Sequence, residues 1–509
     1  RDRADAGSLV GLAVGLAVSS VLWAVAPEAT NITAAVAVVI IVVASLLARR
    51  RAMAAGWSWP LLAFGAVAVS LWGLGTPDSP VCEADSWAQP HAGWHVLTAI
   101  VALAWADRAY GAADPDHAPR LFRRFTDRSI GLVARGLVLA FHRSVDVRWR
   151  ERLPSDRPVL IVANHGNGFV DPVVVAGVLG RLPRFLAKAA LWKVVVARPF
   201  LGLAGVLPVY RTADGDRAGD NTSMFDACHR ELARRATVAI FPEGTTGDRA
   251  GLDRVKSGAA RIALGALPTA PDVVIVPIGM AFESRVETRS RAVVMFGEPI
   301  EVASFAGVGL GADGEPDRVD AEALTARITE SLEQVSPQFA SLDEREVLRA
   351  AAEEERSDAT GHVEVSFGDA EVVARRLAAA EPAARERVIG AYRDFATRLQ
   401  LLGVTARELR PRRVSTGRLV LSAVALFLAS SLIVPVPLIH LPAVLIVVVG
   451  AGLVRSTATK GTVRMLLGLV TLVATWTLAG MVLADGWAAV AAGVVVAVGG
   501  VLALSLIHI

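Results

Sequence analysis

Runs of apolar residues lie at both ends of this 509-residue chain, and a long segment of ordinary polarity separates them. The runs cover 9–26, 32–48, 60–74 and 93–106, then 418–434, 438–454, 465–483 and 487–503. Mean hydropathy is +0.47 and only 20% of residues are charged, whereas soluble proteins contain about 25%. A purely cytosolic protein is therefore excluded. Because about 20 apolar residues cross a bilayer as a helix, we expect about eight transmembrane helices, four in 1–106 and four in 418–509.

Basic residues in the short loops all fall on one side of these predicted helices. Every second loop or flank contains Arg or Lys, namely Arg49, Arg50, Arg51, Arg108, Arg410, Arg412, Arg413, Arg455, Lys460 and Arg464. The alternate loops contain neither residue type. Since Lys and Arg favour the cytoplasmic side, we expect a multi-pass protein of the cytoplasmic (inner) membrane, with the central segment facing the cytoplasm. The alternative is that some runs are buried helices of a soluble core.

The segment 107–310 alternates β-branched runs with stretches long enough for helices. The runs are Val159–Ala163, Val206–Tyr210, Thr237–Phe241, Val273–Ile278 and Ala292–Phe296. This pattern predicts an α/β domain with a mixed or parallel sheet, facing the cytoplasm and flanked by N- and C-terminal transmembrane α-helices. The charge-rich segment 311–417 is expected to be a helical appendage.

Three further features limit what the chain can be. The net charge of +3 does not indicate nucleic-acid binding, and in a membrane protein such an excess usually lies in cytoplasmic loops. Cys82 and Cys228 lie far apart without metal-spaced neighbours, so neither a disulfide framework nor a zinc site is expected. The chain starts at Arg1 and ends in 504–509, which resembles a translated sequencing adapter; we expect a truncated reading frame.

Two predicted strands lead directly into loops whose side chains can transfer protons or form hydrogen bonds. Val159–Ala163 continues into Asn164-His165-Gly-Asn-Gly-Phe-Val-Asp171-Pro172. Thr237–Phe241 continues into Pro-Glu-Gly-Thr-Thr. Ligand sites in open α/β sheets lie at the carboxyl ends of the strands. For the first loop, the alternative is that Asp171 is only the N-cap of a helix and that His165 is incidental.

Four blocks of residues resemble, in the same order, the motifs of the glycerolipid acyltransferase superfamily. The blocks are Asn164–Asp171, Gly205–Arg211, Phe241–Thr245 and Val276–Gly279. The superfamily includes glycerol-3-phosphate and 1-acylglycerol-3-phosphate acyltransferases, and the resemblance covers about 155–300. Two departures occur: five residues separate His165 from Asp171 instead of four, and Thr246 replaces an Arg. Both are similar to fungal-type glycerol-3-phosphate/dihydroxyacetone-phosphate acyltransferases and bacterial relatives, a variant that Asn167, Phe169, Asp248 and Arg249 also fit.

The resemblance implies transfer of a fatty acyl group from acyl-CoA or acyl-carrier protein to the hydroxyl of a glycerol-phosphate acceptor, in phospholipid biosynthesis. A base must take the hydroxyl proton as the oxygen attacks, and His165 is expected to be that general base. Asp171 is expected to hydrogen-bond the other ring nitrogen, fix the tautomer and stabilise the imidazolium. No activated Ser or Cys nucleophile is evident in the sequence, so we expect direct transfer without an acyl-enzyme, and neither a metal nor a cofactor.

A phosphorylated acceptor needs cations and hydrogen-bond donors. Arg211 is the leading candidate, followed by Arg249, Lys188 and Lys256; the alternative for these is ordinary surface charge. The other predicted substrate-binding residues are Asn167, Gly244, Thr245 and Thr246, together with Glu243, which is expected to orient the loop or the acceptor's hydroxyl.

Two other functions remain open. The chain is alternatively a lipid transporter or flippase that carries a non-catalytic acyltransferase-like domain, or a lipid-binding membrane protein. Intramembrane charges usually mark a transport path, and the eight apolar runs contain almost none. The sequence does not decide between glycerol-3-phosphate, dihydroxyacetone phosphate and a lysophospholipid as acceptor.

Overall fold

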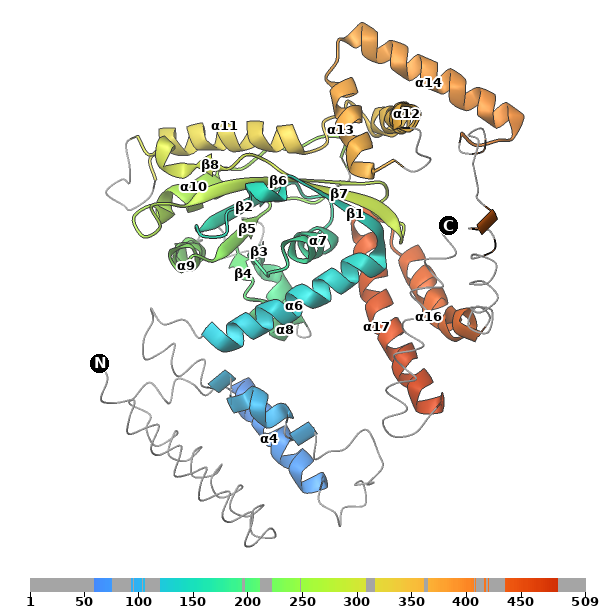
Figure 1. The fold of residues 1–509 in the computed structure, drawn as a ribbon. Coiled ribbons are helices and arrows are strands. Elements are labelled where there is room, and N and C mark those ends of the chain that lie inside the picture. The colour runs from blue at the N-terminus through green and yellow to red at the C-terminus, as the bar shows by residue number, and fades with distance from the viewer. Residues whose placement is uncertain are drawn as a thin grey trace. The chain divides into compact units, whose positions relative to one another are not determined.

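The computed structural model of the chain describes most of its central part (Figure 1). The described residues are 59–75, 93–94, 96–102, 104–105, 120–194, 197–210, 222–247, 249–307, 316–360, 365–406, 408, 416–417, 420 and 435–483. Two compact units divide the chain, Arg1–Phe125 and Thr126–Ile509. In the first unit, α4 (Trp59–Leu74) coincides with the third apolar run. The runs at 9–26, 32–48 and 487–503 lie outside the described residues, as does nearly all of 418–434.

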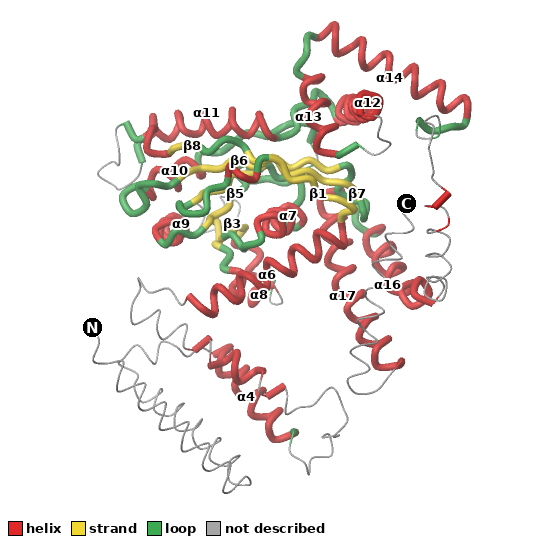
Figure 2. The backbone as a smooth tube through the Cα atoms, in the orientation of Figure 1, coloured by secondary structure: helices red, strands yellow, loops and turns green. Residues whose placement is uncertain are grey.

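A mixed, mostly parallel sheet of eight strands is the centre of the second unit (Figure 2). Its order is β1 (His142–Arg148), β7 (Ser290–Phe296), β6 (Val274–Phe282), β2 (Val159–Ala163), β5 (Thr237–Ile240), β3 (Arg184–Lys188) and β4 (Leu207–Val209), with β8 (Ile300–Glu301) paired to β6. Neighbours along this order are parallel except at β6 and β7, and β8 is also antiparallel. The predicted α/β domain with a mixed sheet is therefore confirmed.

All five predicted strands are present, and three further strands complete the sheet. The additional strands are β1, β3 and β8. The sequence of β1 is His-Arg-Ser-Val-Asp-Val-Arg, and β1 lies at one end of the strand order. An edge strand is covered on fewer sides, so it contains polar residues and lacks the apolar signal that identifies a central strand. By contrast, every residue of β2 is buried.

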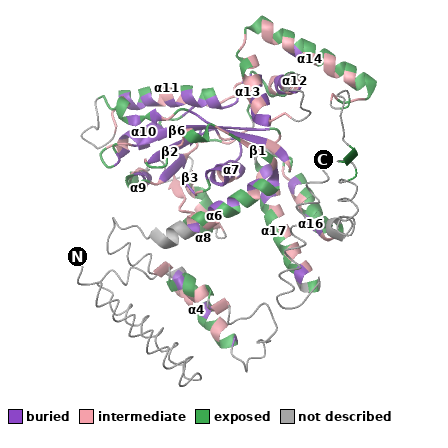
Figure 3. Cartoon of the chain, in the orientation of Figure 1, coloured by how far each residue is buried: buried purple, intermediate pink, exposed green. Residues whose placement is uncertain are grey.

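Helices cover both faces of the sheet, because side chains alternate between faces along each strand. Val159 and Ile161 of β2 pack with α6 (Arg120–Phe141) and α7 (Val170–Leu179). Leu160 of β2 packs on the other face with α9 (Thr222–Ala233), α10 (Gly258–Ala266) and α11 (Arg318–Val335). Figure 3 shows the resulting concentration of buried residues in the sheet and in α7. The short helix α8 (Ala197–Ala204) precedes β4.

The charge-rich segment that follows the sheet is helical. Its helices are α12 (Leu342–Thr360), α13 (Phe367–Ala378) and α14 (Pro382–Leu402). Phe367 at the start of α13 is buried against Val293 and Met295 of β7. This contact attaches the helical segment to the sheet.

Two apolar helices follow, α16 (Pro435–Gly452) and α17 (Thr457–Leu483). They pack on each other, and the Trp476 indole donates a hydrogen bond to His440 Nε2 over 2.9 Å. Within the described ranges, one helix is long and apolar enough to cross a membrane, namely Thr459–Gly480 of α17. Apolar side chains such as Val470 and Val449 are exposed on this pair.

Candidate active site

The loops after β2, β5 and β6 meet at one edge of the sheet because these three strands are parallel. Val162 of β2 lies opposite Ile240 of β5, and Ala163 lies opposite Ile278 of β6. The next residue, Asn164, fixes the first loop to β6 through two hydrogen bonds. Its amide nitrogen donates to the Met280 carbonyl (3.0 Å), and its oxygen accepts from the Met280 N–H (2.7 Å).

His165 and Asp171 are hydrogen-bonded to each other in the loop that follows β2. His165 Nδ1 lies 3.1 Å from Asp171 Oδ2. The same oxygen accepts the N–H groups of Gly166 (2.7 Å) and Asn167 (2.8 Å), and Asp171 is fully buried. A carboxylate at Nδ1 favours the tautomer with the proton on that nitrogen, which leaves Nε2 as a proton acceptor. The imidazole ring also stacks on Phe241 from the second loop, with centroids 4.0 Å apart.

Helix α7 begins at Val170, so Asp171 lies inside its first turn and is not its N-cap. The alternative interpretation of Asp171 as an N-cap is thus wrong. Asn167 satisfies the start of the helix instead: its side-chain oxygen accepts the N–H groups of Phe169 (3.0 Å) and Val170 (3.1 Å). Asn167 is fully buried and does not line the pocket described below.

Glu243 connects the two loops. Its Oε1 accepts the backbone N–H of His165 (2.6 Å), and its Oε2 accepts the N–H of Asp253 (3.0 Å). Burial raises the pKa of Glu243, and the hydrogen bond from His165 opposes this shift. A buried carboxylate bridging two N–H groups fixes the distance between the loop that carries His165 and the loop after β5.

The loop after β5 turns sharply at Gly244, whose φ is +67°. A Cβ at this position would lie 2.8 Å from Lys256 Nζ, so the lysine amine packs directly over the glycine. The Thr245 hydroxyl donates to Asp253 Oδ2 (3.2 Å), and Arg249 forms an ion pair with the same carboxylate. Thr246 is partly buried beside them. The structure therefore brings Glu243, Gly244, Thr245, Thr246, Arg249 and Lys256 together.

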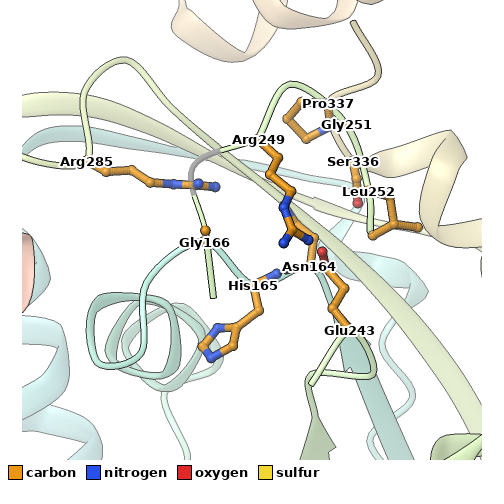
Figure 4. A pocket seen from close by; sticks show the side chains of 11 residues that line it. Asn164, His165, Gly166, Glu243, Arg249, Gly251, Leu252, Arg285, Ser336 and Pro337 are labelled. Atoms are coloured by element: carbon orange, nitrogen blue, oxygen red, sulfur yellow. Dashed lines mark hydrogen bonds between the residues drawn. The ribbon is translucent and has the colours of Figure 1, made fainter. Parts of the chain in front are cut away.

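An open pocket lies where these loops meet (Figure 4). Its lining residues are Asn164, His165, Gly166, Glu243, Gly247, Arg249, Gly251, Leu252, Arg285, Ser336 and Pro337. The side chains of Arg249 and Arg285 provide two positive charges, and Figure 4 shows that the His165 ring points away from both. Gly166 leaves room for Arg285, because a Cβ at 166 would lie 1.8 Å from a guanidinium nitrogen.

Arg285 is absent from the sequence-based prediction of the site. It lies three residues after the end of β6, which is parallel to β2. The loop after β6 therefore lies at the same edge as His165, and this rule of parallel strands is the signal that identifies it. Of the other predicted residues, Lys188 is exposed at the carboxyl end of β3 and does not line the pocket. Arg211 and Asp248 lie outside the described residues.

Comparison with known proteins gives one consistent result. Residues 144–281 match the protein family described as Acyltransferase. Glycerol-3-phosphate O-acyltransferase 2 of Saccharomyces cerevisiae is 37% identical over 134 residues, which cover 26% of this chain and 18% of the yeast protein. A chloroplastic 1-acyl-sn-glycerol-3-phosphate acyltransferase of Arabidopsis thaliana is 29% identical over 138 residues, covering 26% of this chain and 35% of the plant protein.

Among solved structures, the 1-acyl-sn-glycerophosphate acyltransferase of Thermotoga maritima aligns with 54% of this chain and 93% of its own, at a TM-score of 0.34 and 15% identity. The match to the yeast relative covers less than a fifth of the length of that protein. The sequence matches nevertheless agree with each other and with the ordered motifs around His165 and Glu243. Residues 144–281 of this chain are therefore similar to the acyltransferase family.

Proposed function

We propose that this protein is a membrane-bound O-acyltransferase that acylates glycerol-3-phosphate or 1-acylglycerol-3-phosphate in phospholipid biosynthesis. The donor is acyl-CoA or acyl-carrier protein. The observation that carries the proposal is the 3.1 Å contact between His165 Nδ1 and the buried Asp171 carboxylate, inside the segment that matches the acyltransferase family.

The proposed reaction is a direct transfer with His165 as general base. Nε2 takes the proton of the acceptor hydroxyl while its oxygen attacks the thioester carbonyl, and Asp171 stabilises the imidazolium. The tetrahedral intermediate then collapses: the carbon–sulfur bond breaks, and the thiolate leaves and takes the proton from the imidazolium. Cys228 is a poor candidate for a covalent route, because it is fully buried in α9 and burial raises its pKa to about 12.

We propose that the cations around the pocket bind the phosphate of the acceptor. Arg249 and Arg285 line it, and guanidinium groups form paired, charge-assisted hydrogen bonds with phosphate. Arg249 would exchange its ion pair with Asp253 for the ligand. Arg211 and Lys256 complete the proposed set, with Thr245 and Thr246 as hydroxyl donors.

The membrane part of the proposal rests on α17 and on the apolar runs. We propose membrane regions at 1–106 and 418–509, a catalytic domain at 107–310 and a helical appendage at 311–417, with the catalytic domain facing the cytoplasm. An acylated product partitions into lipid, so a site beside the bilayer releases its product without exposing the acyl chain to water.

The test is an acceptor panel in membranes. A radiolabelled acyl donor is supplied with glycerol-3-phosphate, dihydroxyacetone phosphate, 1-acylglycerol-3-phosphate or an uncharged monoacylglycerol. We expect transfer to phosphorylated acceptors, and we expect Arg285→Ala to raise their KM by roughly tenfold, since a hydrogen bond to a charged group is lost. The KM of the acyl donor should not change.

Arg318→Ala is the matched control for the panel, because Arg318 is exposed on α11 and forms its ion pair with Glu322, one turn further along the same helix. Equal use of the uncharged acceptor, or an Arg285→Ala variant with unchanged acceptor KM, would refute the assignment of the phosphate. Lipid flipping in proteoliposomes without any acyl transfer would support the transporter alternative instead.

A further inference from the structure

The loop that carries His165 is held from its buried side by the first turns of α17. The Thr462 hydroxyl donates a hydrogen bond to Asn167 Oδ1 over 2.8 Å. Two residues later, Arg464 donates to the Val286 carbonyl over 2.5 Å. Met465 is only 3% exposed and belongs to the same core cluster as Ala163 and Val170, which flank the loop. Helix α17 also contacts α7, and Figure 1 shows it running up to the sheet beside that helix.

Gly461 permits this close approach. A Cβ at residue 461 would lie 2.5 Å from the Arg285 carbonyl oxygen and 3.0 Å from Asn167 Nδ2. The nearer of these atoms belongs to the backbone, so it cannot rotate away from a methyl group. Any side chain at 461 would displace α17 from the two loops that carry Asn167 and Arg285.

A continuous set of hydrogen bonds connects α17 to the imidazole. Thr462 bonds to the side chain of Asn167, and the backbone N–H of Asn167 bonds to Asp171 Oδ2. That same oxygen lies against His165 Nδ1. Thr462 touches none of the reacting atoms in this arrangement. Its effect on His165 passes through Asn167 and Asp171.

The contacts described above all lie in the first turns of α17. Over its candidate membrane span, only 11% of the residues in the apolar window are buried. The rest of the helix exposes apolar side chains such as Val473 and Leu478. One helix therefore joins an apolar, exposed surface to the loop that carries the proposed base.

We propose that Gly461 and Thr462 are positioning residues for the catalytic loop, so that acyl transfer depends on how α17 is seated. This inference rests on the proposed function, because it concerns the geometry of the His165–Asp171 pair. It assigns α17 a part in catalysis in addition to that of an anchor.

The first test removes the hydroxyl of Thr462 in the full-length protein in nanodiscs. Thr462→Val should lower kcat by roughly fivefold to tenfold, the effect of one lost hydrogen bond, and leave the KM of the acyl donor within about twofold. Thr462→Ser keeps the donor and should restore kcat. Thr477→Val is the control, because the Thr477 hydroxyl is exposed and donates to the Val473 carbonyl of its own helix.

The second test measures the loop without any assay of activity. Amide hydrogen exchange of the peptide covering 166–170 should be faster in Thr462→Val and in Gly461→Ala than in the wild type. Gly468→Ala is the matched control, because a Cβ at 468 meets nothing within 4 Å.

The outcomes separate this inference from the proposed function. Suppose that transfer requires His165. The inference is then overturned, and the proposed function stands, if Thr462→Val has the kcat and the hydrogen exchange of the wild type. The same holds if Thr462→Ser behaves like Thr462→Val. If exchange responds as expected but the wild type transfers no acyl group to any acceptor, the loop is positioned by α17 and the proposed function is wrong.

Discussion

One oxygen atom of Asp171, Oδ2, takes part in three interactions. It accepts the N–H groups of Gly166 and Asn167 and contacts His165 Nδ1 at 3.1 Å, in a fully buried position. The backbone N–H groups of the loop thus fix the Asp171 carboxyl beside the imidazole, which is where the proposed mechanism generates a positive charge.

The raised pKa of Glu243 predicts that the stability of the folded protein depends on pH. Burial raises the pKa of Glu243 from its ordinary value of 4.5, so the folded state holds this proton at pH values where the unfolded chain has released it. Stability contributed by Glu243 therefore falls as pH rises from about 4.5 through the raised pKa. Glu243→Gln cannot titrate, so the Tm of wild type minus that of Glu243→Gln should decrease over this range.

Thermal unfolding of both proteins in detergent at several pH values between 4 and 8 measures this difference. Because every other titrating group is shared, their effects cancel in the subtraction. A difference that does not change with pH, or that increases with it, would show that burial does not raise the Glu243 pKa.

At the scale of elements, β1 and α13 are joined by a small polar cluster. Asp146 of β1 accepts the Ser366 hydroxyl (2.7 Å) and the Gly368 N–H (2.7 Å), and Arg148 pairs with Asp369 (2.9 Å). Ser366 is the N-cap of α13 and accepts the Asp369 N–H. The edge strand thus fixes the start of a helix that is remote in sequence.

Asp146→Ala should lower the free energy of unfolding by about 1–2 kcal/mol, because two donors at the start of α13 lose their acceptor. Denaturant unfolding in detergent measures the loss, with Asp226→Ala, an exposed position on α9, as the control. Equal destabilisation by the two variants would show that the cluster contributes nothing specific.

The sequence predicted the strands whose residues are apolar and buried. It missed features that depend on contacts between residues far apart in the chain. The run Val159–Ala163 is β2 to the residue, since all five side chains are buried. Strand β3, Arg-Phe-Leu-Ala-Lys, has a charged residue at each end and only three apolar residues between them, so it does not stand out. Likewise, Thr462 lies far from Asn167 in the chain, and only the folded structure brings the two together.

At the scale of the whole molecule, the fold links one edge of the sheet to an apolar helix. The α/β unit collects His165, Glu243 and Arg285 at the carboxyl ends of three parallel strands. Helix α17 combines length and apolarity sufficient to cross a bilayer with direct contact to the loop of His165. The ordered motifs, the family match and this geometry support the proposed acyl transfer at that edge.

The most direct test of this account is the rate of acyl transfer by purified His165→Ala in nanodiscs, measured beside wild type with a phosphorylated acceptor. Loss of a general base should lower kcat by about 10²- to 10⁴-fold while expression, membrane insertion and Tm remain those of the wild type. Transfer by His165→Ala at a rate close to wild type would contradict the central claim that His165 is the base of an acyltransferase.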